Sequence, residues 1–361
     1  MATDSSTAAP TQPNKLVSNG ALRKTCAQIL SAAGLCDADA ELVADTLVQA
    51  DLWGHQSHGT LRLPAYVARL RSGAVNSKAR PSLVRDGGAI ALMDGGGAMG
   101  QVVANAAMNV AIERARKFGI GAISVRNSNH FGTAMYFTLL AARRACIGFI
   151  ATNASPAMPP WGGRTKAVGT NPWSWAAPAG KHPSMVLDIA NTAVARGKIH
   201  LARQRGEPIP EGWALDEKGQ PTTDPDDALA GVTLPMAGHK GYGIALMMDV
   251  LAGVLSGSAF AGAVAGPFQS ERPGRVGHFV LALNVEAFMP VSEFEQRQDE
   301  LIQALKQTPL ADGFAEILYP GEPEAALEEK SIRDGISLPG ATFTALEALC
   351  REFDTAMPHS T

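Results

Sequence analysis

The sequence predicts an α/β fold in which a β-rich middle domain is flanked by helices from both ends of the chain. Apolar residues recur at helical spacing near both ends, and short β-rich runs separated by Gly, Pro and Asn turns fill the middle. The composition is typical of a globular protein, with 46% hydrophobic and 18% charged residues. A chain of 361 residues is long enough for two domains with a sizeable core.

The chain divides into four expected parts. Residues 1–14 lack the apolar segment of a signal peptide and predict a disordered lead-in. Residues 15–78 form an N-terminal helical part, because apolar residues at helical spacing follow an Asp cap and precede stop glycines. Residues 79–320 form the α/β domain. Residues 321–361 return to charged helix and are expected to pack with the N-terminal helices.

Strands are expected at five β-rich runs of the middle domain: "AIALMD", "GAISVRN", "IGFIATN", "SMVLDIAN" and "HFVLALNVEAF". The longest apolar run, residues 242–266, has the length of a membrane span. It is interpreted instead as a buried helix followed by a Gly/Ala loop, because Asp249 lies inside it and small residues interrupt its second half.

Charge and cysteine content exclude several classes of protein. The net charge of −3 and the pI of about 6.3 give no basis for a nucleic-acid or membrane partner. The four cysteines form no C-x-x-C pair and lack the density of a disulfide framework. A reducing, cytoplasmic location is therefore expected.

A glycine motif raises the question of a dinucleotide-binding loop. Gly95, Gly97 and Gly100 have the spacing G-x-G-x-x-G between a predicted strand and a predicted helix. A Rossmann unit also needs an acidic residue at the end of the second strand, where this chain has Arg126. An arginine there could bind a 2′-phosphate, but the alternation of strands and helices does not continue. The motif is interpreted as a tight strand-to-helix turn, with a Rossmann site as the alternative.

His130 is the first candidate catalytic residue. It follows a buried-looking strand, at a turn made by Asn129 and Gly132, where α/β enzymes expose catalytic groups. Imidazole exchanges protons near neutral pH, which suits general acid–base catalysis. The alternative is a histidine that is hydrogen-bonded in the turn for structural reasons.

The segment "GHQSHGTLR" indicates a carboxylate site. His58 and Arg62 are four residues apart at a helix start and can face one pocket, where a guanidinium would grip a carboxylate with two hydrogen bonds. Ser57 is read as a capping residue in the simpler alternative, in which Arg62 is a surface arginine. His55 and His58 spell H-x-x-H, so a metal-dependent hydrolase or lyase that also uses His130 is a remote alternative.

Two further stretches indicate a ligand site. Asp188 lies near the end of an apolar strand, and His239 and Lys240 stand in a glycine turn ahead of a helix. A lysine at a helix entry can meet a phosphate or an amide of a bound cofactor, whereas the alternative is a solvated loop lysine.

The ordered motifs of the chain closely resemble the malate/L-lactate dehydrogenase family of the non-Rossmann type, which includes sulfolactate and ureidoglycolate dehydrogenases and cyclic-imine 2-carboxylate reductases. The matching stretches cover roughly 57–324. They are "SHGTLRL", "DGGGAMGQ", "RNSNHFGTAMYF", "TNASPAMPPWGG", "GTNPWSWAAP", "LDIANTAVARGKI", "PEGWALDEKGQPTTDP", "GHKGYGIALMMDVLAGVLSG" and "YPGEPE".

The resemblance implies a fold that binds NAD or NADP in residues 79–320 without a Rossmann loop, and no metal. It implies that His130 and His58 are the catalytic residues, with His130 exchanging the proton with the substrate. It also implies that Ser57 and Arg62 bind the substrate, with Arg62 holding the carboxylate. It also implies a homodimer with the site near the subunit boundary. Contacts to the cofactor are implied for Ser155, Asp188, Ile189, Ala190, His239 and Lys240.

Three residues, at two places in the chain, depart from the family pattern. Ala154 stands where many members have a serine, and Asn284 and Val285 stand where an acidic residue or a proline is usual. The expected activity is hydride transfer between nicotinamide and C2 of a small 2-oxo or 2-hydroxy carboxylic acid. The near alternative is reduction of a cyclic imine 2-carboxylate on the same fold.

Overall fold

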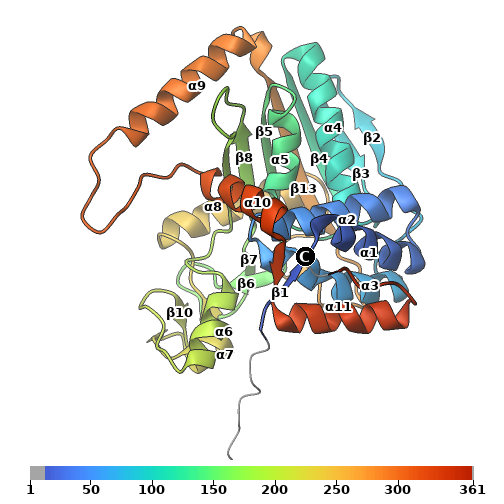
Figure 1. The fold of residues 1–361 in the computed structure, drawn as a ribbon, viewed down its shortest axis with the longest axis vertical. Helices are drawn as coiled ribbons and strands as arrows, with labels where there is room; N and C mark the ends of the chain where they lie inside the picture. Colours follow the sequence, from blue (N-terminus) through green and yellow to red (C-terminus); the bar gives the residue numbers. More distant parts are fainter. Residues whose placement is uncertain (1–12, 360–361) are drawn as a thin grey trace, which may run out of the picture.

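A mixed seven-stranded sheet forms the centre of the molecule in the computed structural model, which describes residues 13–359 (Figure 1). The strand order is β2-β3-β4-β13-β5-β8-β9. Only β3 and β4 are parallel within this described sheet, and helix α4 connects them; every other neighbouring pair is antiparallel. The seven strands are β2 (Ser82–Asp86), β3 (Ile90–Asp94), β4 (Ile120–Ser128), β5 (Cys146–Thr152), β8 (Trp173–Ala177), β9 (Met185–Ile189) and β13 (Val276–Asn284).

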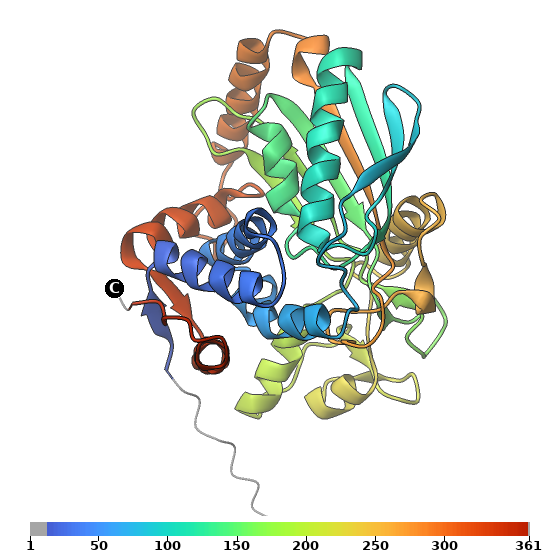
Figure 2. The same ribbon diagram turned by 90° about the vertical axis from the view of Figure 1, so that its right-hand side faces the viewer.

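Helices α4 (Gly100–Phe118) and α5 (Met135–Ala142) cover one face of the sheet (Figures 1 and 2). Small alanines of α4 pack tightly on the sheet, and Ile123 and Val280 complete this buried cluster. The packing fixes the end of β4, which carries the turn with His130.

Helices from both chain ends pack together beside this domain. Strand β1 (Lys15–Val17) pairs antiparallel with β14 (Ile336–Leu338), so the start of the described chain lies against its last part (Figure 2). One buried cluster contains Leu22, Leu47 and Leu349 from the two ends. The helices of this layer are α1 (Asn19–Ala32), α2 (Asp37–Leu52), α3 (Leu63–Arg71), α10 (Glu322–Asp334) and α11 (Gly340–Glu352).

A small lobe lies apart from the main sheet. Its three-stranded sheet and helices α6 and α7 enclose a separate small core around Ile199. The lobe contains α6 (Arg196–Arg205), β10 (Ala214–Leu215), β11 (Pro221–Thr222), α7 (Pro225–Ala230) and β12 (Val232–Thr233). The elements outside the lobe are β6 (Pro156–Met158), β7 (Val168–Gly169), α8 (His239–Asp249) and α9 (Val291–Lys306), with α9 at the far end of the molecule (Figure 1).

The long apolar run differs from its expected structure. Helix α8 continues into a π-helical turn, Val250–Val254, and the helical length agrees with the prediction. The prediction of a buried helix is wrong for its outer face, because Met247 and Val254 are more than half exposed. None of the helices in the described residues combines the length and apolar character needed to span a membrane.

The predicted lead-in, residues 1–14, lies almost wholly outside the described residues. The late strand is shorter than expected: β13 ends at Asn284, whose side chain accepts a hydrogen bond from the Glu286 N–H and starts a short 3-10 turn. Strand β8 was not predicted, because "PWSWAAP" lies among prolines and glycines that indicate a loop.

Candidate active site

A buried carboxylate, that of Asp51, fixes the segment between α2 and α3 through hydrogen bonds. Two short 3-10 turns, Gln56–His58 and Thr60–Arg62, replace regular helix here. Asp51, in the last turn of α2, accepts hydrogen bonds from the Thr60 N–H (2.8 Å) and the Thr60 hydroxyl. Gly59 permits this approach, because a Cβ at that position would overlap the Asp51 carboxylate. Burial raises the pKa of Asp51 to about 7, although the hydrogen bonds from Thr60 lower it.

Ser57, His58 and Arg62 form one connected group on these turns. The Ser57 hydroxyl lies 2.9 Å from His58 Nδ1, and Arg62 Nε donates to the Ser57 carbonyl at 2.6 Å. Burial, with Arg62 and His55 nearby, lowers the pKa of His58 to about 4. The Arg62 Nη1 atom is buried and has no hydrogen-bond partner among the described residues. Arg62 is thus a guanidinium with a donor still to be satisfied.

His130 lies directly beside this group. Its ring is stacked on the His58 ring, with centroids 5.7 Å apart and planes 13° apart. Its Nδ1 atom lies 2.7 Å from the Tyr66 hydroxyl and 3.3 Å from the Gly132 backbone nitrogen. Burial, followed by the charges of His58 and Arg62, holds the pKa of His130 well below its usual range, and burial raises that of Tyr66 to about 12. The imidazole is neutral, and the protonated phenol fixes its orientation.

The glycine motif packs against the same loop. A Cβ on Gly100 would lie 2.2 Å from the Asn129 carbonyl oxygen and 2.4 Å from the His130 carbonyl oxygen, and one on Gly95 would lie 2.9 Å from the Asn127 oxygen. Glycine at these two positions lets α4 approach the backbone that carries His130.

Arg126 is engaged within the sheet. Its Nε atom donates to Asp94 Oδ2 at 2.8 Å, from the end of β4 to the neighbouring end of β3. The Asn127 amide donates to the same carboxylate. This ion pair connects the ends of the two parallel strands and gives Arg126 a local partner.

Asp188 caps helix α5 from the end of β9. Its Oδ2 atom accepts the Met135 N–H and the Thr133 hydroxyl, both at 2.8 Å. The Thr133 oxygen also lies 3.2 Å from His55 Nδ1, and His55 Nε2 lies 3.5 Å from Glu324 Oε1. Burial raises the pKa of Asp188, against these hydrogen bonds. The network joins α10 and the β4–α5 loop to β9.

Two buried asparagines connect the segments that hold the predicted cofactor residues. Asn171 accepts the Ala154 N–H at 3.0 Å and donates to the Ala245 carbonyl of α8 at 2.9 Å. Asn191, directly after Ile189 and Ala190, donates to the Asn171 carbonyl at 2.7 Å. Ser155, at the turn after Ala154, lies against Gly266, and His239 and Lys240 are exposed in the first turn of α8. Ala154, which stands where many family members have a serine, thus keeps a partner for its backbone N–H in Asn171.

Several residues of the site were not predicted. Tyr66, Asp51 and Thr133 act through contacts between distant elements, and Asn171 and Asn191 lie in stretches that resemble ordinary turns. The position of Tyr66, four residues after Arg62, was the one signal that could have placed it on the same helix face.

The H-x-x-H pair does not assemble a metal site. Both nitrogens of His55 have partners in Thr133 and Glu324, and His58 Nδ1 lies against Ser57. Across residues 13–359, no three His, Cys, Asp or Glu side chains are grouped as metal ligands would be.

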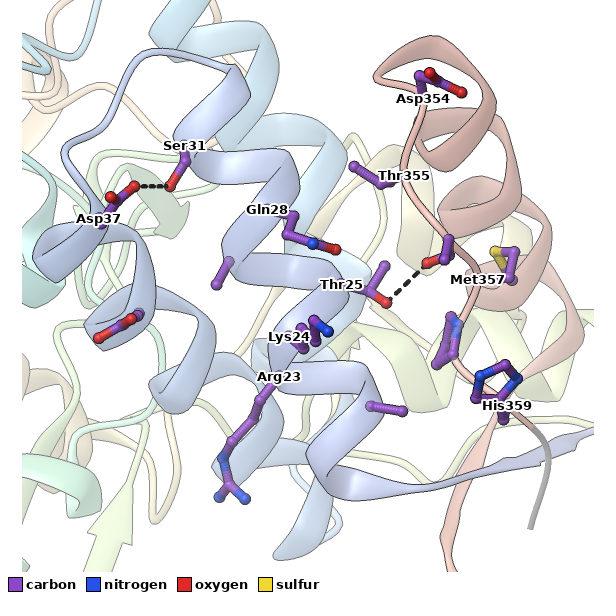
Figure 3. A pocket seen from close by; sticks show the side chains of 15 residues that line it. Arg23, Lys24, Thr25, Gln28, Ser31, Asp37, Asp354, Thr355, Met357 and His359 are labelled. Atoms are coloured by element: carbon purple, nitrogen blue, oxygen red, sulfur yellow. Dashed lines mark hydrogen bonds between the residues drawn. The ribbon is translucent and has the colours of Figure 1, made fainter.

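A separate cavity of about 910 Å³ lies between α1 and the segment 354–359 and contains none of the predicted site residues (Figure 3). Charged side chains such as Lys24, Asp37 and Asp354 line it together with Met357, and the Thr25 hydroxyl donates to the Ala356 carbonyl at 3.0 Å. The predicted residues Ser57, His58 and Arg62 lie instead in the buried group around His130.

A comparison with protein families agrees with this geometry. The family model for malate/L-lactate dehydrogenase matches residues 17–347. The chain belongs to the malate/L-lactate dehydrogenase family. It is therefore an oxidoreductase, and the predicted family is confirmed.

Relatives in this family cover nearly the whole chain. A malate dehydrogenase from Pyrococcus abyssi is 40% identical, over 90% of this chain and 91% of the relative. The NAD(+)-dependent ureidoglycolate dehydrogenase of Escherichia coli is 34% identical, over 89% and 92%. The structure of sulfolactate dehydrogenase from Methanocaldococcus jannaschii has a TM-score of 0.90 at 38% identity, covering 94% of this chain and 98% of that one. A delta1-piperideine-2-carboxylate reductase from Pseudomonas syringae has a TM-score of 0.83 at 27% identity, covering 93% and 99%.

Proposed function

We propose that this protein is an NAD(P)-dependent dehydrogenase that transfers a hydride between nicotinamide and C2 of a small 2-oxo or 2-hydroxy carboxylic acid. The observation that supports it most strongly is the pairing of a neutral, oriented imidazole at His130 with an incompletely bonded guanidinium at Arg62. One group exchanges a proton and the other neutralises a carboxylate, and both lie within a single buried cluster.

The chain's own residues supply the proton and the charge. Arg62 would hold the substrate carboxylate through Nη1, beside the neutral ring of His58. His130 would exchange the proton with the substrate oxygen through Nε2 in the tautomer that carries the ring proton on Nδ1, where it donates to the Tyr66 hydroxyl oxygen 2.7 Å away. Oxidation of a 2-hydroxy acid needs the neutral imidazole, and reduction of a 2-oxo acid needs the imidazolium.

The residues around α8 fit a nicotinamide dinucleotide, NAD or NADP. The helix begins after Gly238, which has a φ of +64° and no side-chain cap. The Gly241 N–H donates to the Met236 carbonyl, which leaves the His239 and Lys240 N–H groups without a partner among the described residues. This combination is the donor set for a phosphate. The exposed Trp161 ring, with its centroid 5.7 Å from that of His239, adds an apolar surface. Bound nicotinamide would supply or accept the hydride, and Ser155, Asp188, Ile189 and Ala190 remain predicted contacts.

The non-Rossmann binding mode and the homodimer are part of the same proposal. The single parallel strand pair and the packing of Gly100 against His130 support a glycine turn without a pyrophosphate. The exposed apolar residues Met247, Val250 and Val254 support a subunit interface at α8 and its π-helical turn. Free Cys26 and Cys36 agree with a reducing, cytoplasmic location.

Reduction of a cyclic imine 2-carboxylate is the second candidate, favoured by the similarity to the piperideine-2-carboxylate reductase structure. The same carboxylate would bind Arg62, and His130 would protonate nitrogen in place of oxygen.

Purified protein mixed with NADH or NADPH and a panel of 2-oxo acids and cyclic imines tests both proposals through the loss of NAD(P)H absorbance. Turnover of a 2-oxo acid is expected; turnover of imines alone would select the second candidate. An increase in melting temperature with NADH or NADPH is expected from cofactor binding alone.

A further inference from the structure

An exposed phenylalanine stands over the carboxylate-binding arginine. The Phe268 side chain is 74% exposed, yet its ring centroid lies 4.8 Å from Arg62 Cζ. A cation–π contact of this kind covers one face of the guanidinium and leaves its edge, with Nη1, for a carboxylate. The uncovered side of the ring is an apolar surface next to the expected substrate position.

Hydrogen bonds fix the loop that carries Phe268 to α3, the helix that follows Arg62. Arg69 of α3 donates to the carbonyls of Gly266 and Gln269, and Ser72 donates to the Ser270 carbonyl. Inside the loop, Gln269 Oε1 accepts the Gly266 N–H at 2.9 Å. These four hydrogen bonds therefore fix the loop of residues 266–270, which carries the Phe268 ring.

The same loop also lies against the predicted cofactor side. A Cβ on Gly266 would meet the Ser155 hydroxyl at 2.7 Å, so the start of the loop contacts Ser155 while its middle contacts Arg62. Phe268 thus lies where the substrate and cofactor segments come together.

Among the four groups that act electrostatically on His130, Arg62 is the one with a buried nitrogen that has no hydrogen-bond partner in the described residues. Four groups act electrostatically on His130: His58, Arg62, His278 and Arg69. Arg69 is engaged by three oxygens, from the two loop carbonyls and Asn129 Oδ1. Both nitrogens of His278 have hydroxyl partners, and burial lowers its pKa to about 3, while that of His58 is about 4.

We propose that Phe268 determines substrate specificity and selects a 2-oxo or 2-hydroxy acid with one carboxylate and an apolar substituent on C3. The carboxylate binds Arg62, and the C3 substituent packs on the Phe268 ring. A second carboxylate or a sulfonate at that position would lose solvent against an apolar ring. This inference rests on the proposed dehydrogenase function.

The test compares kcat/KM for two groups of 2-oxo acids with the same cofactor. Pyruvate, 2-oxobutyrate and 4-methyl-2-oxopentanoate carry one charge; oxaloacetate and 3-sulfopyruvate carry two. We expect the wild-type enzyme to prefer the best singly charged acid over both doubly charged acids by at least about ten-fold, the usual value of one mismatched group in a pocket.

Three variants examine the role of the ring. Phe268→Ala should lower kcat/KM for 4-methyl-2-oxopentanoate about ten-fold or more and leave pyruvate within about three-fold. Phe268→Arg should raise kcat/KM for oxaloacetate relative to pyruvate by at least about ten-fold. Phe288→Ala is the matched control, because Phe288 is also 74% exposed but stands in the turn after β13; it should change no ratio.

The outcomes separate this inference from the proposed function. A wild-type preference for oxaloacetate or 3-sulfopyruvate, or an equal loss on all substrates in Phe268→Ala, would overturn the specificity role while the dehydrogenase function stands. No turnover of any 2-oxo acid would overturn the proposed function itself. Because Phe268 is largely exposed, its variants should melt within a few degrees of wild type, so a loss of folding would also contradict the inference.

Discussion

Replacing Asp51 by asparagine should change how stability depends on pH. Asp51 is a buried carboxylate whose pKa is raised from 3.8 to about 7, mainly by burial. In the unfolded chain the carboxyl returns to its ordinary value, so between about pH 4 and about pH 7 the folded protein binds more protons than the unfolded protein. The free energy of unfolding of the wild type therefore falls as pH rises through this window.

The size of the effect follows from the shift. A difference of about three pKa units, at about 1.4 kcal/mol per unit, corresponds to about 4 kcal/mol lost between low and neutral pH. Asparagine keeps an oxygen that can accept the hydrogen bonds from Thr60 but cannot titrate. Asp51→Asn should therefore lack this part of the slope and gain stability relative to wild type as pH rises.

Urea unfolding followed by tryptophan fluorescence at several pH values between about 4 and 8 measures the slope. Glu41→Gln is the matched control, because Glu41 is an exposed carboxylate on the same helix. The control should follow the wild type. Parallel curves for wild type and Asp51→Asn would show that Asp51 does not titrate in this range, and the reasoning would fail.

The remaining predictions concern the chemistry. His130→Asn should lower kcat by about 10²–10⁴, the usual contribution of a positioned acid or base, with cofactor affinity unchanged; near-native turnover would assign the proton to another group. In the wild type, the rate of reduction should rise as pH falls below neutral, since the imidazolium forms at a pKa well below its usual range, and a flat profile would contradict this assignment. Arg62→Lys should raise KM sharply for an acid substrate but little for its amide, because lysine loses the two-pronged contact, and equal losses would indicate a structural role. Gly97→Ala should cost about 1 kcal/mol of stability, since Gly97 has a φ of +79°, and leave NAD(P)H affinity within a few-fold, whereas Lys240→Ala should weaken it. Fluorescence titration beside thermal melts checks this pair, and the reverse pattern would restore the Rossmann interpretation.

Local sequence patterns predicted the parts of the site that depend on neighbours along the chain. The spacing of His58 and Arg62 predicted that they lie close together at a helix start, and the structure places them on two successive 3-10 turns. The position of His130 after a predicted strand agrees with its place two residues beyond the end of β4. Helical periodicity at both ends predicted the helices that now share one buried cluster. These features follow from periods of two or of about 3.6 residues, which are visible in one dimension.

Contacts between distant elements could not be predicted in the same way. Tyr66 and His130 are 64 residues apart, and Thr133 and Asp188 are 55 apart. No local sequence pattern predicts which strand end will face which helix. The contact between Tyr66 and His130 and the capping of α5 by Asp188 therefore become visible only in the folded structure. The exposure of the helix face around Met247 could not be predicted for the same reason. An apolar helix has the same sequence pattern whether it packs against its own chain or against another surface.

The glycine motif shows how a familiar pattern can be explained by its packing. Gly100 allows the start of α4 to approach the backbone of His130, while the adjoining Met99 and Val102 belong to the buried cluster of the terminal helices. The first turn of α4 therefore touches both the loop that carries His130 and the helical layer that carries Arg62. A Cβ at Gly100 would separate these two surfaces. The close approach is sufficient reason for glycine at this position of the motif.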